Sequence, residues 1–130
     1  MGVALGLADT SLFIARESGR PLDVAALPAE LCVSVVTMAE LQAGVLAASD
    51  VHARAARLTT LGTARTLRPI TIDEPVAIAW ATLRIELRDL GRRMPSNDAW
   101  IAATAIANRI PVVTQDADYE DVPGLAVIRV

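Results

Sequence analysis

Lysine is absent from this chain, and several other reactive side chains are scarce. All 12 basic residues are arginine, and cysteine, histidine, tyrosine and phenylalanine each occur once. The single cysteine, Cys32, lies in an apolar stretch and cannot form an internal disulfide, which fits a reducing compartment. The single histidine, His52, lies in a polar segment, where we expect an exposed helical residue. No histidine pair is therefore available for metal-free acid–base cleavage of RNA.

Several familiar motifs and long apolar runs are also missing. The sequence has no Gly-x-Ser-x-Gly elbow, no Gly-x-Gly-x-x-Gly after the first predicted strand, and no phosphate loop with its lysine. No uncharged run, 1–8 and 99–107 included, approaches the ~20 residues of a membrane-spanning helix. No basic flank of the signal-peptide type opens the chain. We expect a cytoplasmic protein with no membrane segment.

The apolar pattern predicts one α/β domain over residues 1–130. A hydrophobic content of 53% in 130 residues is enough for one compact core. Buried strands are predicted at 3–8, 31–36, 111–114 and 125–130, and 70–72 is predicted as a short strand or connector. Helices are predicted at 10–17, 37–48, 50–65, 73–90 and 96–108. Continuous apolar strands separated by helices predict a central, mostly parallel sheet with helices on both faces.

Four acids, Asp9, Glu40, Asp98 and Asp116, lie where a predicted strand ends or a helix begins. The carboxyl ends of the strands in an open α/β sheet face one crevice, so these acids can meet there despite their separation in sequence. Gathered carboxylates repel one another, which raises their pKa values unless a cation neutralises them. Mg²⁺ or Mn²⁺, which prefer carboxylate oxygens and water, suit such a site.

Two of these acids also match helix-capping patterns. Asp9 precedes Thr10 and can accept a hydrogen bond from the first turn of a helix. Glu40 follows Thr37 by three residues, as in a capping box. A fold that needed only caps would be served equally well by serine, threonine or asparagine, so the choice of acids favours a metal site.

The other two acids have structural alternatives too. Asp98 lies two residues after Ser96, the expected cap of its helix, and the macrodipole favours an acid there. Asp98 nevertheless shares the inner face of that helix, where a partly buried carboxylate needs a partner and no lysine can provide one. Asp116 and Asp118 also suit a turn in which each side chain bonds its own backbone.

Four segments, taken in order, resemble the PIN domain in its small prokaryotic form, the VapC toxin family of type II toxin–antitoxin pairs. These segments are 7–11 (Leu-Ala-Asp-Thr-Ser), 34–41 with Gly44 following, 97–107 opening with Asn-Asp, and 113–119 (Val-Thr-Gln-Asp-Ala-Asp-Tyr). The resemblance implies a homodimeric endoribonuclease that uses Mg²⁺ or Mn²⁺ and leaves a 5′-phosphate and a 3′-hydroxyl. It also implies silencing by a VapB-type antitoxin, with DNA contacted only indirectly through that antitoxin.

The resemblance assigns roles to individual residues. Asp9 and Asp98 match the primary metal ligands, and Glu40 and Asp116 match the rest of the acidic quartet. Asp118 matches a more variable supporting position and is followed by Tyr119, where the family often has phenylalanine. Three hydroxyl residues match neighbours of the acids that can bond carboxylates or a phosphate: Thr10, Ser11 and Thr114.

Arginines on the long predicted helix and just beyond its end are candidates for RNA binding. Arg84, Arg88 and Arg92 recur every fourth residue, with Arg93 adjacent, and guanidinium groups bind phosphates in bidentate fashion. The alternative is a solvated helix face that also carries acids.

Two other functions fit parts of the sequence. A phosphoacceptor receiver domain also gathers aspartates at strand ends, but it needs a lysine that this chain lacks. A non-catalytic interaction module, in which the acids are caps, is the stronger alternative. The helices in 37–60 offer two apolar stripes, of which one packs on the sheet and part of the other can form a two-fold contact. The first stripe is Met38, Leu41, Val45 and Ala48, and the second is Val51, Ala55, Leu58 and Leu61. Phe13, Trp100 and Tyr119 either line an antitoxin groove or belong to the core.

Overall fold

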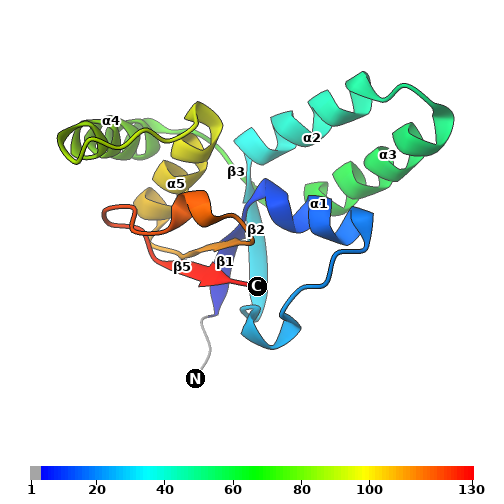
Figure 1. Ribbon diagram of the computed structural model, residues 1–130, viewed down its shortest axis with the longest axis horizontal. Helices are drawn as coiled ribbons and strands as arrows, with labels where there is room; N and C mark the ends of the chain where they lie inside the picture. Colours follow the sequence, from blue (N-terminus) through cyan, green and yellow to red (C-terminus); the bar gives the residue numbers. More distant parts are fainter. Residues whose placement is uncertain (1–3) are drawn as a thin grey trace.

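A five-stranded parallel sheet forms the centre of the computed structural model, which describes residues 4–130 (Figure 1). The strand order is β3-β2-β1-β4-β5, and each neighbouring pair is parallel. The strands are β1 (Leu5–Ala8), β2 (Glu30–Ser34), β3 (Pro69–Ile70), β4 (Val112–Thr114) and β5 (Val127–Arg129). The predicted α/β fold with a parallel sheet is confirmed. The predicted first strand began at Val3, which lies outside the described residues.

Residues 4–130 form five helices, singly or in pairs between strands, which cover both faces of the sheet (Figure 1). They are α1 (Thr10–Ser18), α2 (Val35–Ala47), α3 (Val51–Arg65), α4 (Glu74–Asp89) and α5 (Ser96–Asn108), with short 3₁₀ turns η1 (Val24–Ala26) and η2 (Ala117–Tyr119). The longest of these helices has 16 residues, and none of the helices in 4–130 is long and apolar enough to cross a membrane.

Successive residues of the strands point into two separate cores, because side chains alternate across a sheet. On one face, Leu7 and Val112 pack with Leu83, Leu87 and Ile101 of α4 and α5. The opposite core joins the next strand residues to α1, α2 and α3 and contains Ala8, Leu12, Val33, Leu41, Val45, Leu61 and Val113. Burial on both faces explains why the strands read as continuous apolar runs.

The start of α2 differs from the predicted capping box. The helix begins at Val35, because the buried Ser34 side chain accepts a hydrogen bond from the Thr37 backbone N–H at 3.2 Å. Val35 and Val36, predicted as strand, are therefore helical. The capping-box interpretation of Thr37 and Glu40 is wrong, since both residues lie inside the helix.

The start of α5 also differs from the sequence expectation. Ser96 is the first helical residue, and Pro95 occupies the cap position without a side-chain hydrogen bond. The predicted capping role of Ser96 is wrong, because the fixed geometry of proline ends the preceding segment one residue earlier. Asp98 consequently lies in the first turn of α5.

The α2–α3 hairpin projects from the rest of the molecule (Figure 1) and leaves apolar side chains uncovered. Leu41 and Val45 are buried against the sheet, as predicted for the first stripe. In the second stripe Leu61 is buried, whereas Val51 is 81% exposed and Leu58 is 50% exposed. An apolar surface on α3 therefore remains available for a partner. Cys32 is buried and His52 is exposed, as expected.

Candidate metal centre

The candidate site lies at the carboxyl ends of β1 and β4, where the order of the sheet reverses. β1 pairs with both β2 and β4, so the chain leaves β1 to one side while β4 lies on the other. Such switch points form a crevice in open α/β sheets. Asp9 directly follows β1, and its backbone N–H donates to the carbonyl of Val113 in β4 at 3.1 Å. Asp116 follows β4 by two residues.

Asp9 is the most deeply buried acid of the group, with only 3% of its surface exposed. Its Oδ1 accepts hydrogen bonds from the Ser11 backbone N–H at 3.2 Å and from Ser11 Oγ at 2.6 Å, so Asp9 caps α1 as predicted. Burial raises the pKa of Asp9 to about 6, and the charge of Asp116 adds to the shift. The hydrogen bonds from Ser11 oppose the rise in pKa. The capping bonds therefore use one carboxylate oxygen of Asp9, and the negative charge of this carboxylate remains unfavourable because it is buried.

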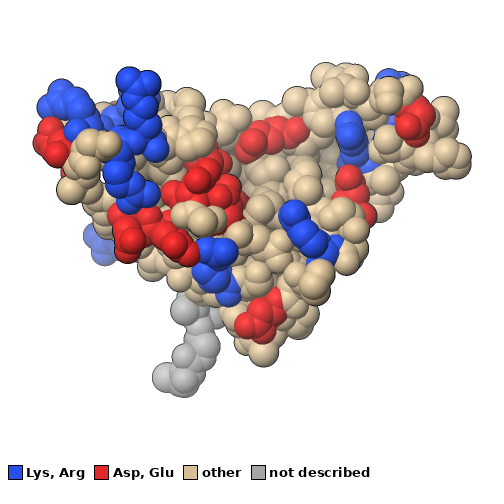
Figure 2. Space-filling view, in the orientation of Figure 1, with Lys and Arg blue, Asp and Glu red and all other residues tan. Residues whose placement is uncertain are grey.

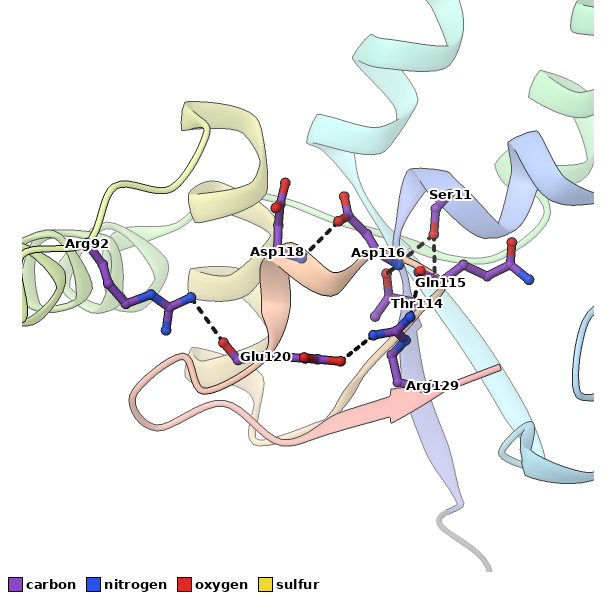
Figure 3. Close-up of polar contacts among 8 residues, drawn as sticks. All are labelled: Ser11, Arg92, Thr114, Gln115, Asp116, Asp118, Glu120 and Arg129. Carbon is purple, nitrogen blue, oxygen red and sulfur yellow. Dashed lines mark hydrogen bonds and ion pairs between the residues drawn. The ribbon is translucent and has the colours of Figure 1, made fainter.

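Hydroxyl groups fasten the turn after β4 to α1 (Figure 3). Ser11 Oγ lies 3.3 Å from Thr114 Oγ1 and accepts a hydrogen bond from the Gln115 backbone N–H at 3.0 Å. Thr114 Oγ1 accepts from the Asp116 backbone N–H at 2.8 Å. These bonds fix the position at which Asp116 leaves the sheet.

Three carboxylates come close together at this turn. Asp98, Asp116 and Asp118 each offer an oxygen, and these oxygens lie within 4.8 Å of one another. That spacing is close to the span of opposite ligands around one divalent ion, about 4–5 Å. Asp116 Oδ1 also accepts from the Asp118 backbone N–H at 2.9 Å, so the predicted turn bond is present beside the cluster (Figure 3). The donor set of carboxylate oxygens fits Mg²⁺ or Mn²⁺.

Asp98 is half-buried, and its environment disfavours a negative charge. Burial raises the pKa of Asp98 to about 6, and the charges of Asp116, Asp118 and Glu40 raise it further. A hydrogen bond from Tyr119 opposes the rise in pKa. Because the charge of Glu40 raises the pKa of Asp98, the glutamate on α2 interacts electrostatically with the acids on α5 and in the turn after β4.

Glu40 reaches this group from the second turn of α2. Its Oε1 accepts a hydrogen bond from Thr10 Oγ1 at 2.8 Å, and Thr10 Oγ1 also lies 3.1 Å from Thr37 Oγ1. Acidic side chains gather near the middle of the face shown in Figure 2, in the hollow between the α4–α5 side and the α2–α3 hairpin. Of the predicted quartet, Asp98 and Asp116 lie in the cluster of oxygens within 4.8 Å, whereas Asp9 and Glu40 are not part of that cluster. Electrostatic influence links these two acids to it, Asp9 through Asp116 and Glu40 through Asp98.

Comparison with known proteins identifies the family of this fold. Residues 7–125 match the PIN domain. The chain belongs to the PIN domain family. Its relatives place it in the VapC branch: it is 46% identical over 127 residues to Ribonuclease VapC5 of Mycobacterium tuberculosis, covering 98% of this chain and 94% of the relative. Ribonuclease VapC4 of the same organism is 47% identical over 130 residues, the full length of both chains.

A solved structure shares the fold over nearly the whole length. The toxin–antitoxin structure VapBC-5 from Mycobacterium tuberculosis contains a chain that matches this PIN domain with a TM-score of 0.89 and 43% identity, covering 98% of this chain and 99% of that one. The resemblance drawn from the sequence is thereby confirmed for family and fold.

Tyr119 is a site neighbour whose part the sequence did not reveal. Its side chain is fully buried in the core under α4 and α5, and its hydroxyl donates to Asp98 Oδ1 at 3.2 Å. Phe13 is also a core residue, with 6% exposure, and it borders a hollow between α1 and α3 that Arg16 and Thr60 also line. Trp100 is half-buried and stacks on Trp80, with ring centroids 4.5 Å apart. One signal was available in the sequence: the chain's single tyrosine follows an acidic turn.

In this chain, an arginine-lined groove lies between α4 and the start of α5. The groove has a volume of about 880 Å³, and its lining includes all four predicted arginines together with Trp80 and Ser96. Arg84 lies over the Trp80 ring, 5.0 Å from its centroid. Arg92 is already engaged, because it donates to the backbone carbonyls of Asp121 at 2.7 Å and Glu120 at 3.0 Å. Figure 2 shows basic side chains clustered beside the acidic region.

Proposed function

We propose that this chain is a Mg²⁺- or Mn²⁺-dependent endoribonuclease that acts as the toxin of a type II toxin–antitoxin pair. The convergence of the acidic quartet carries the proposal, since burial and mutual repulsion raise the pKa of both Asp9 and Asp98 to about 6. A site of this kind gains stability from a bound cation. The names of the relatives, ribonucleases VapC4 and VapC5, support the same activity.

The capping pattern separates this proposal from a non-catalytic module. Asp9 caps α1 and Asp116 caps η2, so these two acids have a structural use. Glu40 lies in the interior of α2, and Asp98 follows a helix start capped by no side chain. Capping therefore leaves Glu40 and Asp98 unexplained, whereas a metal-dependent nuclease uses all four.

The acidic residues would have different roles in hydrolysis. A bound Mg²⁺ or Mn²⁺ supplies a water of lowered pKa and stabilises negative charge on the phosphoryl group. Asp98, Asp116 and Asp118 would hold the ion, with Asp9 as a further ligand from the floor of the crevice. Glu40, fixed by Thr10, would orient the attacking water or help to hold a second ion. Hydrolysis would leave a 5′-phosphate and a 3′-hydroxyl.

RNA would approach along the groove between α4 and α5. Arg84, Arg88 and Arg93 supply positive charge that the acidic centre lacks, and phosphate contacts by arginine are sequence-independent. The groove reaches Ser96 at the start of α5, two residues from Asp98. A phosphate backbone held there would lead toward the acids.

The proposed protein partners are a VapB-type antitoxin and a second copy of the chain. VapBC-5, the solved structure cited above, is a toxin–antitoxin system. An antitoxin tail lying along the crevice could present a basic side chain to the acids and so block RNA. Contact with DNA would arise only through the antitoxin. The exposed Val51 and Leu58 of α3 offer the apolar surface for a two-fold contact.

Cleavage of RNA by the purified protein tests the enzymatic proposal. Asp98→Asn should lose Mn²⁺-dependent cleavage by at least about a hundredfold, because the amide preserves shape while removing the charge of a ligand. Asp50→Asn is the matched control, since Asp50 caps the exposed start of α3 and asparagine caps equally well. Unchanged cleavage by Asp98→Asn, or equal loss in both variants, would contradict the proposal.

A further inference from the structure

We infer that Tyr119 is a positioning residue that holds the carboxylate of Asp98 in the orientation needed to bind a metal ion. The inference rests on the proposed metal-dependent function and concerns a side chain outside the acidic quartet. It starts from one contact between η2 and α5, the hydrogen bond from Tyr119 Oη to Asp98 Oδ1 at 3.2 Å.

The tyrosine hydroxyl is committed to this carboxylate. Tyr119 is fully buried, and a buried hydroxyl needs a hydrogen-bond partner. The ring packs in the core with Leu7, Leu83 and Ile101, so the hydroxyl cannot turn toward solvent without moving that core. Phenylalanine would fill the same space, so the hydroxyl itself is not required for packing.

The carboxylate gains a fixed orientation from the bond. The terminal torsion of an aspartate is broad, so an exposed carboxylate samples many angles. A donor on Oδ1 restricts that torsion and leaves Oδ2 without this bond. Groups that hydrogen-bond a metal ligand typically contribute about 10- to 100-fold to metal affinity.

The 3₁₀ turn that carries Tyr119 is anchored on both sides. Before it, Asp116 caps η2, because its carboxylate accepts a hydrogen bond from the Asp118 backbone N–H. After it, Glu120 is held by Arg92 through its carbonyl and by Arg129 through an ion pair (Figure 3). Tyr119 is therefore a rigid donor rather than a mobile one, and its hydroxyl can define where Asp98 points.

Calorimetric titration with Mn²⁺ and RNA-cleavage kinetics test the inference together. Tyr119→Phe should raise the Kd for Mn²⁺ by about tenfold or more, as expected for loss of a bond to a ligand. The KM for RNA should stay within about twofold, and kcat should fall at limiting Mn²⁺ and recover at saturating Mn²⁺. This split separates positioning from general damage to the fold.

Thr104→Val is the matched control. Thr104 is also fully buried and on α5, but its hydroxyl donates to the Trp100 carbonyl and has no bond to the acids. The control should keep the wild-type Kd for Mn²⁺. An unchanged Kd in Tyr119→Phe, or an equal rise in Thr104→Val, would overturn the role of Tyr119 while leaving the proposed nuclease intact. A wild-type protein that binds no Mn²⁺ would overturn both.

Discussion

Thr10 and Glu40, thirty positions apart in sequence, are joined by a hydrogen bond of 2.8 Å from Oγ1 to Oε1. Thr10 is the first residue of α1, and Glu40 lies in the interior of α2. The bond draws the glutamate toward the helix start that Asp9 caps. Glu40 is therefore held by tertiary structure instead of by the start of its own helix.

Glu40→Gln should separate catalysis from stability. Glutamine can still accept the Thr10 hydrogen bond, so the melting temperature of the metal-free protein should change by no more than about 2 °C. Loss of the charge should reduce cleavage by at least about a hundredfold. Thermal unfolding and single-turnover cleavage measure the two effects. If stability alone changed, Glu40 would have a purely structural role.

Metal-free stability should decline as the pH rises. The pKa of Asp9 is raised to about 6 from 3.8, so the folded state binds this proton more tightly than the unfolded state. The resulting stabilisation is complete below about pH 4 and is lost as the pH passes through about 6; Asp98 acts in the same direction. Denaturant unfolding in EDTA at pH 5 and 7.5 measures the decline. Mn²⁺ should reverse it at pH 7.5 by binding the ionised acids.

Asp9→Asn should remove much of this pH dependence. Asparagine carries no buried charge, so the free energy of unfolding without metal should rise at pH 7.5 by about 2 kcal/mol. This gain is somewhat smaller than the raised pKa of Asp9 alone would give, because the hydrogen bond from Ser11 is weaker to an amide than to a carboxylate. Asp73→Asn, which preserves the cap of α4 at an exposed position, should keep the wild-type pH profile. A destabilised Asp9→Asn protein at pH 7.5 would contradict the proposed cost of burying the Asp9 charge.

Two of the arginines should respond differently to replacement by alanine. Arg84→Ala should raise the KM for RNA about three- to tenfold with little change in melting temperature, since its guanidinium lies over Trp80 at the exposed groove. Arg92→Ala should lower the melting temperature by several degrees, because it removes both bonds to the loop after η2. Cleavage kinetics at two salt concentrations and thermal unfolding compare them. Identical behaviour of the two variants would refute this division of roles.

Expression of the chain alone should arrest bacterial growth. Asp9→Ala or Asp98→Ala should relieve the arrest, as should co-expression of the proposed VapB-type antitoxin. Immunoblotting of each variant controls for failed production. A harmless wild-type chain present at the same level would contradict the toxin assignment and leave the fold unaffected.

Leu58→Arg should convert the proposed homodimer to a monomer. Leu58 is 50% exposed on α3, and a charge in the centre of an apolar contact prevents its burial. Light scattering gives the mass. Ile78→Arg, a similar change at a residue of α4 that is 59% exposed, is the control and should remain dimeric. Dissociation by Ile78→Arg alone would move the interface to α4.

Patterns of burial made the fold predictable from sequence. In β1 and β4, the consecutive residues Leu7–Ala8 and Val112–Val113 each place one side chain in each core, so both residues must be apolar. Burial on both faces distinguishes such parallel strands from strands with one face in solvent. Helix starts marked by Asp50 and Asp73 were also predictable, because each side chain bonds its own helix. Local signals and the global fold agree at these positions.

The contacts that organise the site were harder to predict, because they join residues distant in sequence. The Thr37–Glu40 spacing matched a capping box, but Ser34 already satisfies the Thr37 backbone N–H. The bond from Tyr119 to Asp98 spans 21 positions and depends on how η2 packs against α5. The capping box was therefore placed three residues too late, whereas the bond from Tyr119 to Asp98 depends on tertiary packing that the sequence pattern does not encode.

The stacked pair of Trp80 and Trp100 gives the protein a built-in optical probe. These are the two tryptophans of the chain, their planes differ by 9°, and Trp80 lines the arginine groove. Parallel indoles at 4.5 Å couple their electronic transitions, so circular dichroism should carry a signal specific to the folded α4–α5 pair. A nucleic acid entering the groove would disturb Arg84 above the ring and change the fluorescence. Occupancy of the groove can thus be followed by light alone, without labelling the protein and without turnover.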